Sequence, residues 1–171
     1  MKTVKILKVM HILSWIVFVG LCIKTGIILT SYFISIARPE YAKNLFEGLD
    51  LSQYYTHSFW QYSSIVGYKV LLFSLEAHIA FLVTRLLNTL NLEKPFHESM
   101  HQLMTKISIS IFYLWILAII HNAHVQFLAK RYNFSMELFS GDFIFLAGII
   151  FIFAQIIKRG IEIQQENDLT I

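Results

Sequence analysis

Charged residues are scarce in this chain. Asp, Glu, Lys and Arg make up only 15% of its 171 residues, whereas hydrophobic residues make up 56%. Soluble domains are nearer a quarter charged, so this deficit argues against a soluble domain and indicates lipid as the surrounding solvent. The net charge of +3 is too small to suggest direct binding of nucleic acid, and at this length we expect one domain.

Cysteine and the short motifs of common enzymes are also lacking. Cys22 is the only cysteine, which excludes an intramolecular disulfide and a cysteine metal cluster, and we interpret it as a packing residue. The chain has no Gly-x-Ser-x-Gly turn, no phosphate loop and no Gly-x-Gly-x-x-Gly motif. We therefore expect a protein that is not an enzyme, with no catalytic residues and no cofactor.

Long apolar runs are what the sequence does have. About 20 helical residues cross the ~30 Å core of a bilayer, and four runs approach or exceed that length. We predict membrane-spanning helices at about 9–36, 63–87, 106–128 and 143–157, the last being adequate only if residues 136–142 contribute. The first run is too long for the apolar core of a cleaved signal peptide. The predicted fold is all-α, an antiparallel four-helix bundle in the inner or plasma membrane.

The positions of the basic residues predict the orientation of these helices, because Lys and Arg flanking the spans favour the cytoplasmic side. If both termini are cytoplasmic, eight flanking basic residues lie inside and four lie outside. The inside set is Lys2, Lys5, Lys8, Arg85, Lys94, Lys106, Lys158 and Arg159, and the outside set is Arg38, Lys43, Lys130 and Arg131. This orientation gives an outer loop at 38–62, a cytoplasmic loop at 88–105 and a cytoplasmic tail at 160–171.

The outer loop is rich in aromatic residues, namely Phe46, Tyr54, Tyr55, Phe59, Trp60 and Tyr62. Aromatic rings next to a span commonly lie at the headgroup interface, where one part of the ring is wet and the other is apolar. We therefore predict a lid or re-entrant helix on the outer surface. A ligand-sensing surface is the alternative.

Lys24 and Glu76 are charged residues in the middle of the first two predicted spans. Counted from the cytoplasmic ends, the backbones of Lys24 and Glu76 differ in depth by roughly 6 Å, which a lysine side chain can bridge. We predict a charge pair that fixes helix packing, with a proton or ion relay as the alternative. Lys69 lies near the outer end of its helix, where it can snorkel, and receives no role.

Histidines form two pairs at helical spacing. His121 and His124, with Asn122 between them, would share one face of the third span and could contact a ligand or a metal ion. His97 and His101 form a second pair at the other end of that span. Neither pair has the glutamate arrangement of a zinc hydrolase. We predict no metal site, and metal or haem binding stays an alternative.

The chain also resembles a known family. The resemblance is carried by residues 20–26 (Gly-Leu-Cys-Ile-Lys-Thr-Gly), 44–51 (Asn-Leu-Phe-Glu-Gly-Leu-Asp-Leu), 94–96 (Lys-Pro-Phe), 154–162 and 166–170. Together these segments are similar to the bacterial membrane family called domain of unknown function 2975. The resemblance implies four spans and a membrane partner for a small helix-turn-helix regulator of the Cro/repressor type, and it supplies no catalytic residues.

These observations lead to a functional hypothesis. We expect a membrane sensor or regulator that acts with a cytoplasmic helix-turn-helix regulator and does not itself bind nucleic acid. Its predicted cytoplasmic contact residues are Pro95, Phe96, Glu162, Glu166 and Asp168. The alternative is a small-solute or proton-coupled transporter that uses Lys24 and Glu76. The sequence leaves the oligomeric state open.

Overall fold

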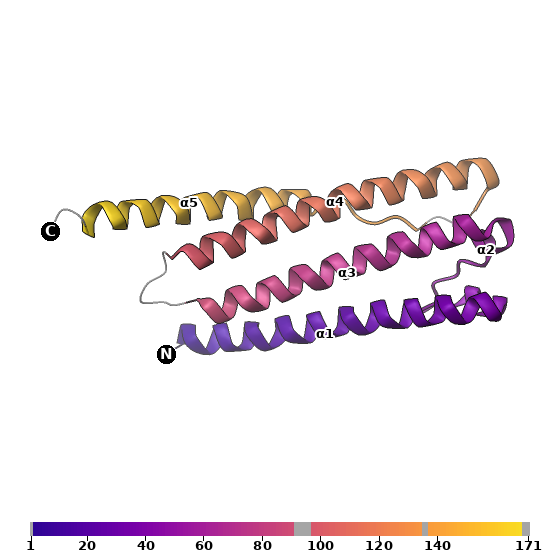
Figure 1. Cartoon of the computed structure of the whole chain (residues 1–171), viewed down its shortest axis with the longest axis horizontal. Helices are drawn as coiled ribbons and strands as arrows, with labels where there is room; N and C mark the ends of the chain where they lie inside the picture. The colour runs from indigo at the N-terminus through magenta and orange to yellow at the C-terminus, as the bar shows by residue number, and fades with distance from the viewer. Residues whose placement is uncertain (1, 91–96, 135–136, 169–171) are drawn as a thin grey trace. The chain divides into compact units, whose positions relative to one another are not determined.

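The protein is all-α in the part that the structure describes, which is residues 2–90, 97–134 and 137–168 of a computed structural model. Side chains are described for residues 4–90, 97–134 and 137–166. The elements are α1 (Lys2–Ala37), η1 (Pro39–Lys43), α2 (Ser52–His57), α3 (Phe59–Thr89), α4 (Glu98–Tyr132) and α5 (Ile144–Asp168). The helices α1 to α5 are labelled in Figure 1.

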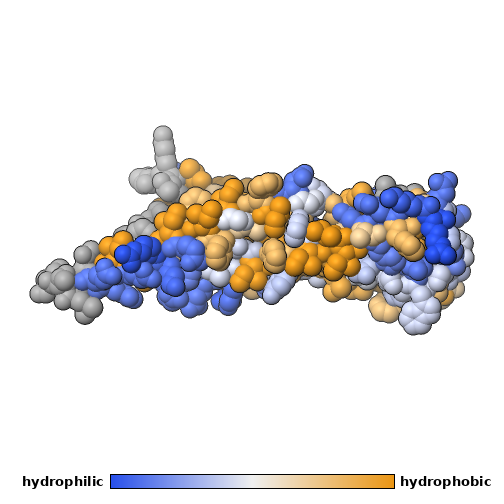
Figure 2. Space-filling model, turned by 90° about the horizontal axis from the view of Figure 1, so that it is seen from above, coloured by the Kyte–Doolittle hydropathy of each residue, from blue (hydrophilic) through white to orange (hydrophobic). Residues whose placement is uncertain are grey.

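The four long helices α1, α3, α4 and α5 are each long and apolar enough to cross a membrane. Many of their large apolar side chains are exposed, among them Ile16 and Phe33 of α1, which are 62% and 65% exposed. Figure 2 shows such hydrophobic residues on the visible surface. Large exposed apolar surfaces suit lipid better than water. The chain is therefore a multi-pass membrane protein with four candidate spans, as the sequence predicts.

The helices extend beyond the predicted spans because leaving the apolar core does not by itself end a helix. α4 begins at Glu98 rather than near residue 106, and the side chain of His97 caps it by accepting a hydrogen bond from the amide of Met100 (3.1 Å). α5 continues to Asp168, so most of the predicted tail is helical. An ion pair between Arg159 and Glu162, one turn apart, supports this extension (2.9 Å).

The described chain forms two compact units. The first comprises Met1–Phe18, His78–Tyr113 and Asp142–Ile171, and the second comprises Val19–Ala77 and Leu114–Gly141. Helices α1, α3 and α4 contribute to both units, whereas η1 and α2 belong to the second.

Hydrogen bonds between helices support the first unit. Thr84 of α3 donates to the hydroxyl of Ser14 in α1 (3.1 Å), and Ser108 of α4 donates to the carbonyl of Ala147 in α5 (2.9 Å). Small polar side chains allow membrane helices to approach closely and to bond across the contact. An apolar cluster accompanies these bonds and contains Leu82, Leu103, Ile107, Ile111 and Ala147.

The core of the second unit is built from three helices and the predicted outer loop. Its buried members are Ile28 of α1, Ala42, Leu45, Leu49, Leu51 and Tyr54 of the loop, Tyr62, Ile65 and Val66 of α3, and Val125 and Leu128 of α4. The loop therefore supplies part of the core instead of only covering it.

The predicted interfacial role of the loop aromatics is wrong for two of them. Tyr54 and Tyr62 are 2% and 0% exposed, and the Tyr62 hydroxyl bonds to the buried hydroxyl of Ser35 (2.7 Å). Phe59 and Trp60, by contrast, are 45% and 80% exposed. A tyrosine whose hydroxyl has a buried hydrogen-bond partner can pack in the core without losing a hydrogen bond. The aromatic composition of the loop therefore does not by itself place its tyrosines at the lipid headgroups.

A tight turn holds the loop in place. The amide of Gly48 donates to the side-chain oxygen of Asn44 (2.9 Å), and the amide of Leu45 donates to the carbonyl of Leu49 (3.0 Å). Gly48 has a φ of +86°, a conformation that side-chain-bearing residues rarely adopt. The turn lets Leu45 and Leu49 both reach the core.

We expect Gly48→Ala to lower the free energy of unfolding by about 1–2 kcal/mol, because alanine resists a positive φ. Gly20→Ala in helix α1 is the matched control, since neither glycine has an atom within 4 Å of the added methyl group. The control should be neutral or slightly stabilising because alanine favours helix. Thermal unfolding of the two purified variants in the same detergent measures the difference. An equal loss of stability in both variants would contradict the role of the turn.

Candidate functional site

The structure places Lys24 and Glu76 in the second unit without joining them in an ion pair. Both are partly buried, on α1 and α3, and no ion pair links them in the described part of the chain. The ammonium of Lys24 instead lies 4.0 Å from the centre of the Phe73 ring and 5.6 Å from that of Phe46. Cation–π contacts thus take the place that the sequence suggests for a carboxylate.

A different lysine is the most buried cation of this unit. Lys69 of α3 is 5% exposed, and its ammonium forms an ion pair of 2.8 Å with Glu137, whose side chain is 64% exposed. The sequence pattern predicts only snorkelling for Lys69 and does not single out Glu137. The two residues are 68 positions apart, so no local pattern could connect them. The only available signal was the general rule that an ionisable group in a span needs a partner.

His121 lies beside this ion pair and is hydrogen-bonded by Asn122, which is itself held by two hydrogen bonds. The side chain of Asn122 donates to the carbonyl of Phe139 (2.8 Å) and accepts from the amide of the same residue (2.9 Å), which fixes its oxygen as an acceptor. That oxygen lies 3.2 Å from His121 Nδ1. Nδ1 therefore carries the proton, and Nε2 presents a lone pair.

The Nε2 atom of His121 is buried and has no hydrogen-bond partner among the described residues. The residue itself is 0% exposed. A buried polar atom of this kind is uncommon because it loses its bond to water without a replacement. It therefore marks a place where a donor from outside the described chain can bind.

The second histidine of the predicted pair has a different partner. His124 Nε2 lies 2.7 Å from the side-chain oxygen of Gln61 in α3. Both histidines meet the ring of Tyr68 edge to face, so they do share one face of α4. Within the described residues no group of three or more His, Cys, Asp and Glu side chains is placed to hold a metal ion.

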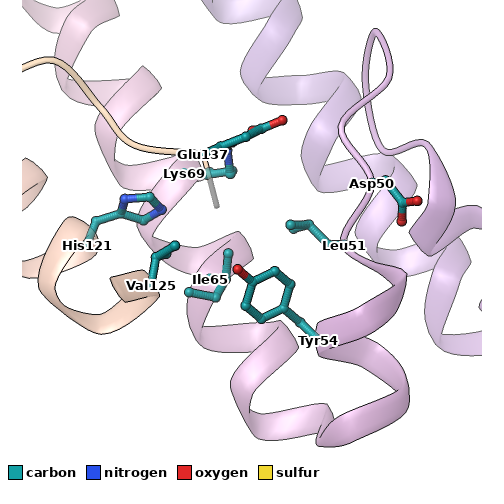
Figure 3. Close-up of a pocket in the computed structure, with 8 residues that line it drawn as sticks. All are labelled: Asp50, Leu51, Tyr54, Ile65, Lys69, His121, Val125 and Glu137. Atoms are coloured by element: carbon teal, nitrogen blue, oxygen red, sulfur yellow. Dashed lines mark hydrogen bonds and ion pairs between the residues drawn. The ribbon is translucent and has the colours of Figure 1, made fainter. Parts of the chain in front are cut away.

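A small cavity, the His121 cavity, collects the polar groups of the second unit. Figure 3 shows Lys69, Glu137, His121 and Tyr54 around it, with Asp50 at its edge. The space open to the centre of a water molecule is about 20 Å³, enough for one water. Burial, and then the charge of Glu137, raise the pKa of Tyr54, so its hydroxyl stays protonated at neutral pH.

A second cavity, the Lys24 cavity, adjoins the first through shared residues. Lys69 and Glu137 line both, and the Lys24 cavity is further lined by Lys24, Phe46 and Phe73 among others. The space open to the centre of a water molecule there is about 190 Å³. The structure thus brings Lys24 together with Lys69 and Glu137 around one space.

The predicted cytoplasmic contact residues are separate from these cavities. Pro95 and Phe96 lie outside the described residues. Glu162, Glu166 and Asp168 are in the last turns of α5, where Glu162 pairs with Arg159.

Removing Glu137 should destabilise the protein more than removing Lys69. Glu137→Ala leaves a buried ammonium without its carboxylate, and we expect it to lower the free energy of unfolding by about 1–3 kcal/mol. Lys69→Met leaves only an exposed carboxylate, which water solvates, so its effect should be smaller. Chemical or thermal unfolding in detergent measures both.

The double variant provides the control for this prediction. In the Lys69→Met background, Glu137→Ala should cost little because no buried charge remains to be compensated. If Glu137→Ala were equally destabilising with and without Lys69, the ion pair would not be the cause.

Comparison with known proteins places the chain in a family. Residues 50–171, more than half of the sequence, match the family model described as a protein of unknown function, DUF2975. The matched region includes the resembling segments at 94–96, 154–162 and 166–170, whereas 20–26 precedes it. Neither the curated proteins nor the solved structures include a match to this chain. The chain belongs to the DUF2975 family.

Proposed function

We propose that this DUF2975 protein is a non-enzymatic membrane sensor that controls a small cytoplasmic helix-turn-helix transcription regulator. In this proposal it is an antiparallel bundle in the inner or plasma membrane of a bacterium, with both termini in the cytoplasm. The excess of basic residues at the predicted cytoplasmic ends supports the orientation. The family resemblance supports the regulator as the partner.

The observation that carries the sensing role is the partly buried polar cluster of the second unit. It contains a buried ammonium on Lys69, the exposed carboxylate of Glu137 and the unpartnered nitrogen of His121. Ionisable groups within membrane spans are costly and commonly mark functional sites. A cluster with one unfilled hydrogen-bonding position can respond to a ligand by changing its internal pairs.

The output would come from the end of α5. Its last turns carry Glu162 and Glu166 together with Gln164 and Gln165, and they extend the helix beyond its apolar part. A helix-turn-helix protein presents a basic surface to DNA. An acidic helix end complements such a surface and, with Pro95 and Phe96, would hold the regulator at the membrane.

Co-purification tests this partnership. The tagged protein, extracted from its native membrane, should bring down the proposed helix-turn-helix regulator, and Glu162→Lys combined with Glu166→Lys should reduce recovery by about tenfold through charge repulsion. Glu40→Lys, which reverses the charge of an exposed residue in η1, serves as the control and should leave recovery unchanged. No complex, together with unchanged target transcription after deletion of the membrane protein, would refute the proposal.

The alternative is a transporter built on Lys24 and Glu76. The absence of an ion pair between them in the described chain favours this alternative, because a carboxylate that is not locked to a lysine can take up and release a proton. A sensor in proteoliposomes should show no gradient-driven flux of protons or small solutes. Flux that disappears in Glu76→Gln would replace the sensor proposal with the transporter.

A further inference from the structure

Lysine ammonium groups line the two cavities of the second unit, and an anionic ligand would neutralise their charge. We propose that they bind the anionic group of an amphiphile, a carboxylate or a phosphate, between Lys24 and Lys69, and that Glu137 is a built-in competitor for this position. The inference deepens the proposed function, since it names the ligand class for the sensor, and it rests on that function for its biological meaning.

The ion pair of Lys69 defines one end of the site. A buried ammonium needs an anion next to it, and Glu137 supplies one at 2.8 Å. The side chain of Glu137 is nevertheless 64% exposed, so water can solvate its carboxylate when it leaves. The position beside the Lys69 ammonium is therefore an anion position that another carboxylate or a phosphate can occupy with the same charge-assisted hydrogen bond.

Lys24 defines the other end. Its ammonium has no carboxylate within ion-pair distance in the described chain, and it lies over Phe73 inside a candidate span. A cation–π contact supplies about 0.5–2 kcal/mol, less than a lysine loses on leaving water for a membrane. A ligand anion would provide the missing charge.

The Lys24 cavity has the size and the walls of a headgroup site. Its space of about 190 Å³ is smaller than the roughly 300–1,000 Å³ of sites that enclose drug-sized molecules. Ile28, Phe46 and Phe73 form its apolar walls. These walls suit the methylene groups next to a charged headgroup. The carboxylates on its lining, Glu47 and Glu137, belong to exposed residues that can turn to water.

His121 adds an independent indication of a ligand. Its buried Nε2 lone pair lines the His121 cavity together with Lys69 and Glu137, and it has no donor among the described residues. One water fits there. A water bound to the ligand anion, or the hydroxyl of a singly protonated phosphate, would donate to Nε2 and satisfy it.

Calorimetry on the purified full-length chain in a neutral detergent tests the inference with four probes: decanoate, decyl phosphate, decanol and inorganic phosphate. We expect saturable binding of decanoate or decyl phosphate, and the stronger of the two identifies the anionic group of the amphiphile as a carboxylate or a phosphate. Decanol should bind at least about tenfold more weakly because it lacks the charge. Equal binding of decanol, or inorganic phosphate binding as tightly as decyl phosphate, would overturn the proposal.

Three variants locate the site. Lys24→Gln should weaken binding by about tenfold, the scale of one charge-assisted hydrogen bond, whereas Lys130→Gln, an exposed lysine of α4, should not. Glu137→Gln should tighten binding several-fold because it removes the competing carboxylate while keeping a hydrogen-bond acceptor for Lys69. If Lys24→Gln matched Lys130→Gln, or if Glu137→Gln left the affinity unchanged, the inference would be wrong.

These measurements are independent of the regulator. Binding of decanoate by a protein that recovers no regulator would refute the proposed function and leave the ligand site intact. Recovery of the regulator by a protein that binds none of the four probes would refute the ligand site and leave the proposed function intact.

Discussion

An ammonium group that leaves water must keep an anion beside it, and in the second unit this requirement falls on Lys69. Its buried position on α3 is stabilised by Glu137, which the chain brings in from the segment before α5. Phe139, two residues further along, is tied to Asn122 of α4 by two hydrogen bonds. The ion pair thus joins α3 to the segment 137–141, which Phe139 joins to α4, and Lys69 lines both cavities.

The predicted outer loop completes this arrangement. The turn at Gly48 directs Leu45 and Leu49 into the core, and Tyr54 of α2 lines the His121 cavity. The loop is therefore a wall of the site and part of its support. A ligand that changes the pairing of Glu137 would act on a segment whose Phe139 contacts Phe73 of α3 and His121 and Asn122 of α4. Sensing in the proposed function rests on this shared packing.

Much of the fold could be predicted because bilayers impose local requirements. Each span needs about 20 apolar residues in sequence, so the four helices were visible as runs. Their ends were less visible, since α5 continues through Lys158 and Arg159, both good helix formers outside an apolar core. The candidate site was mostly missed. His121 and Asn122 were found from their spacing, but Lys69 was set aside, and Lys24 forms no ion pair with Glu76 among the described residues.

The sequence by itself determined that this is an all-α membrane protein with four candidate spans and with ionisable groups within them, because hydropathy and helix length are properties of consecutive residues. Only the tertiary structure decided which charges meet. Lys69 pairs with a carboxylate 68 residues away, and the Lys24 ammonium lies over the Phe73 ring without an ion pair to Glu76 in the described part of the chain. Pairing depends on the rotation of each helix and the path of its loops, and these follow from packing over the whole unit rather than from any local pattern.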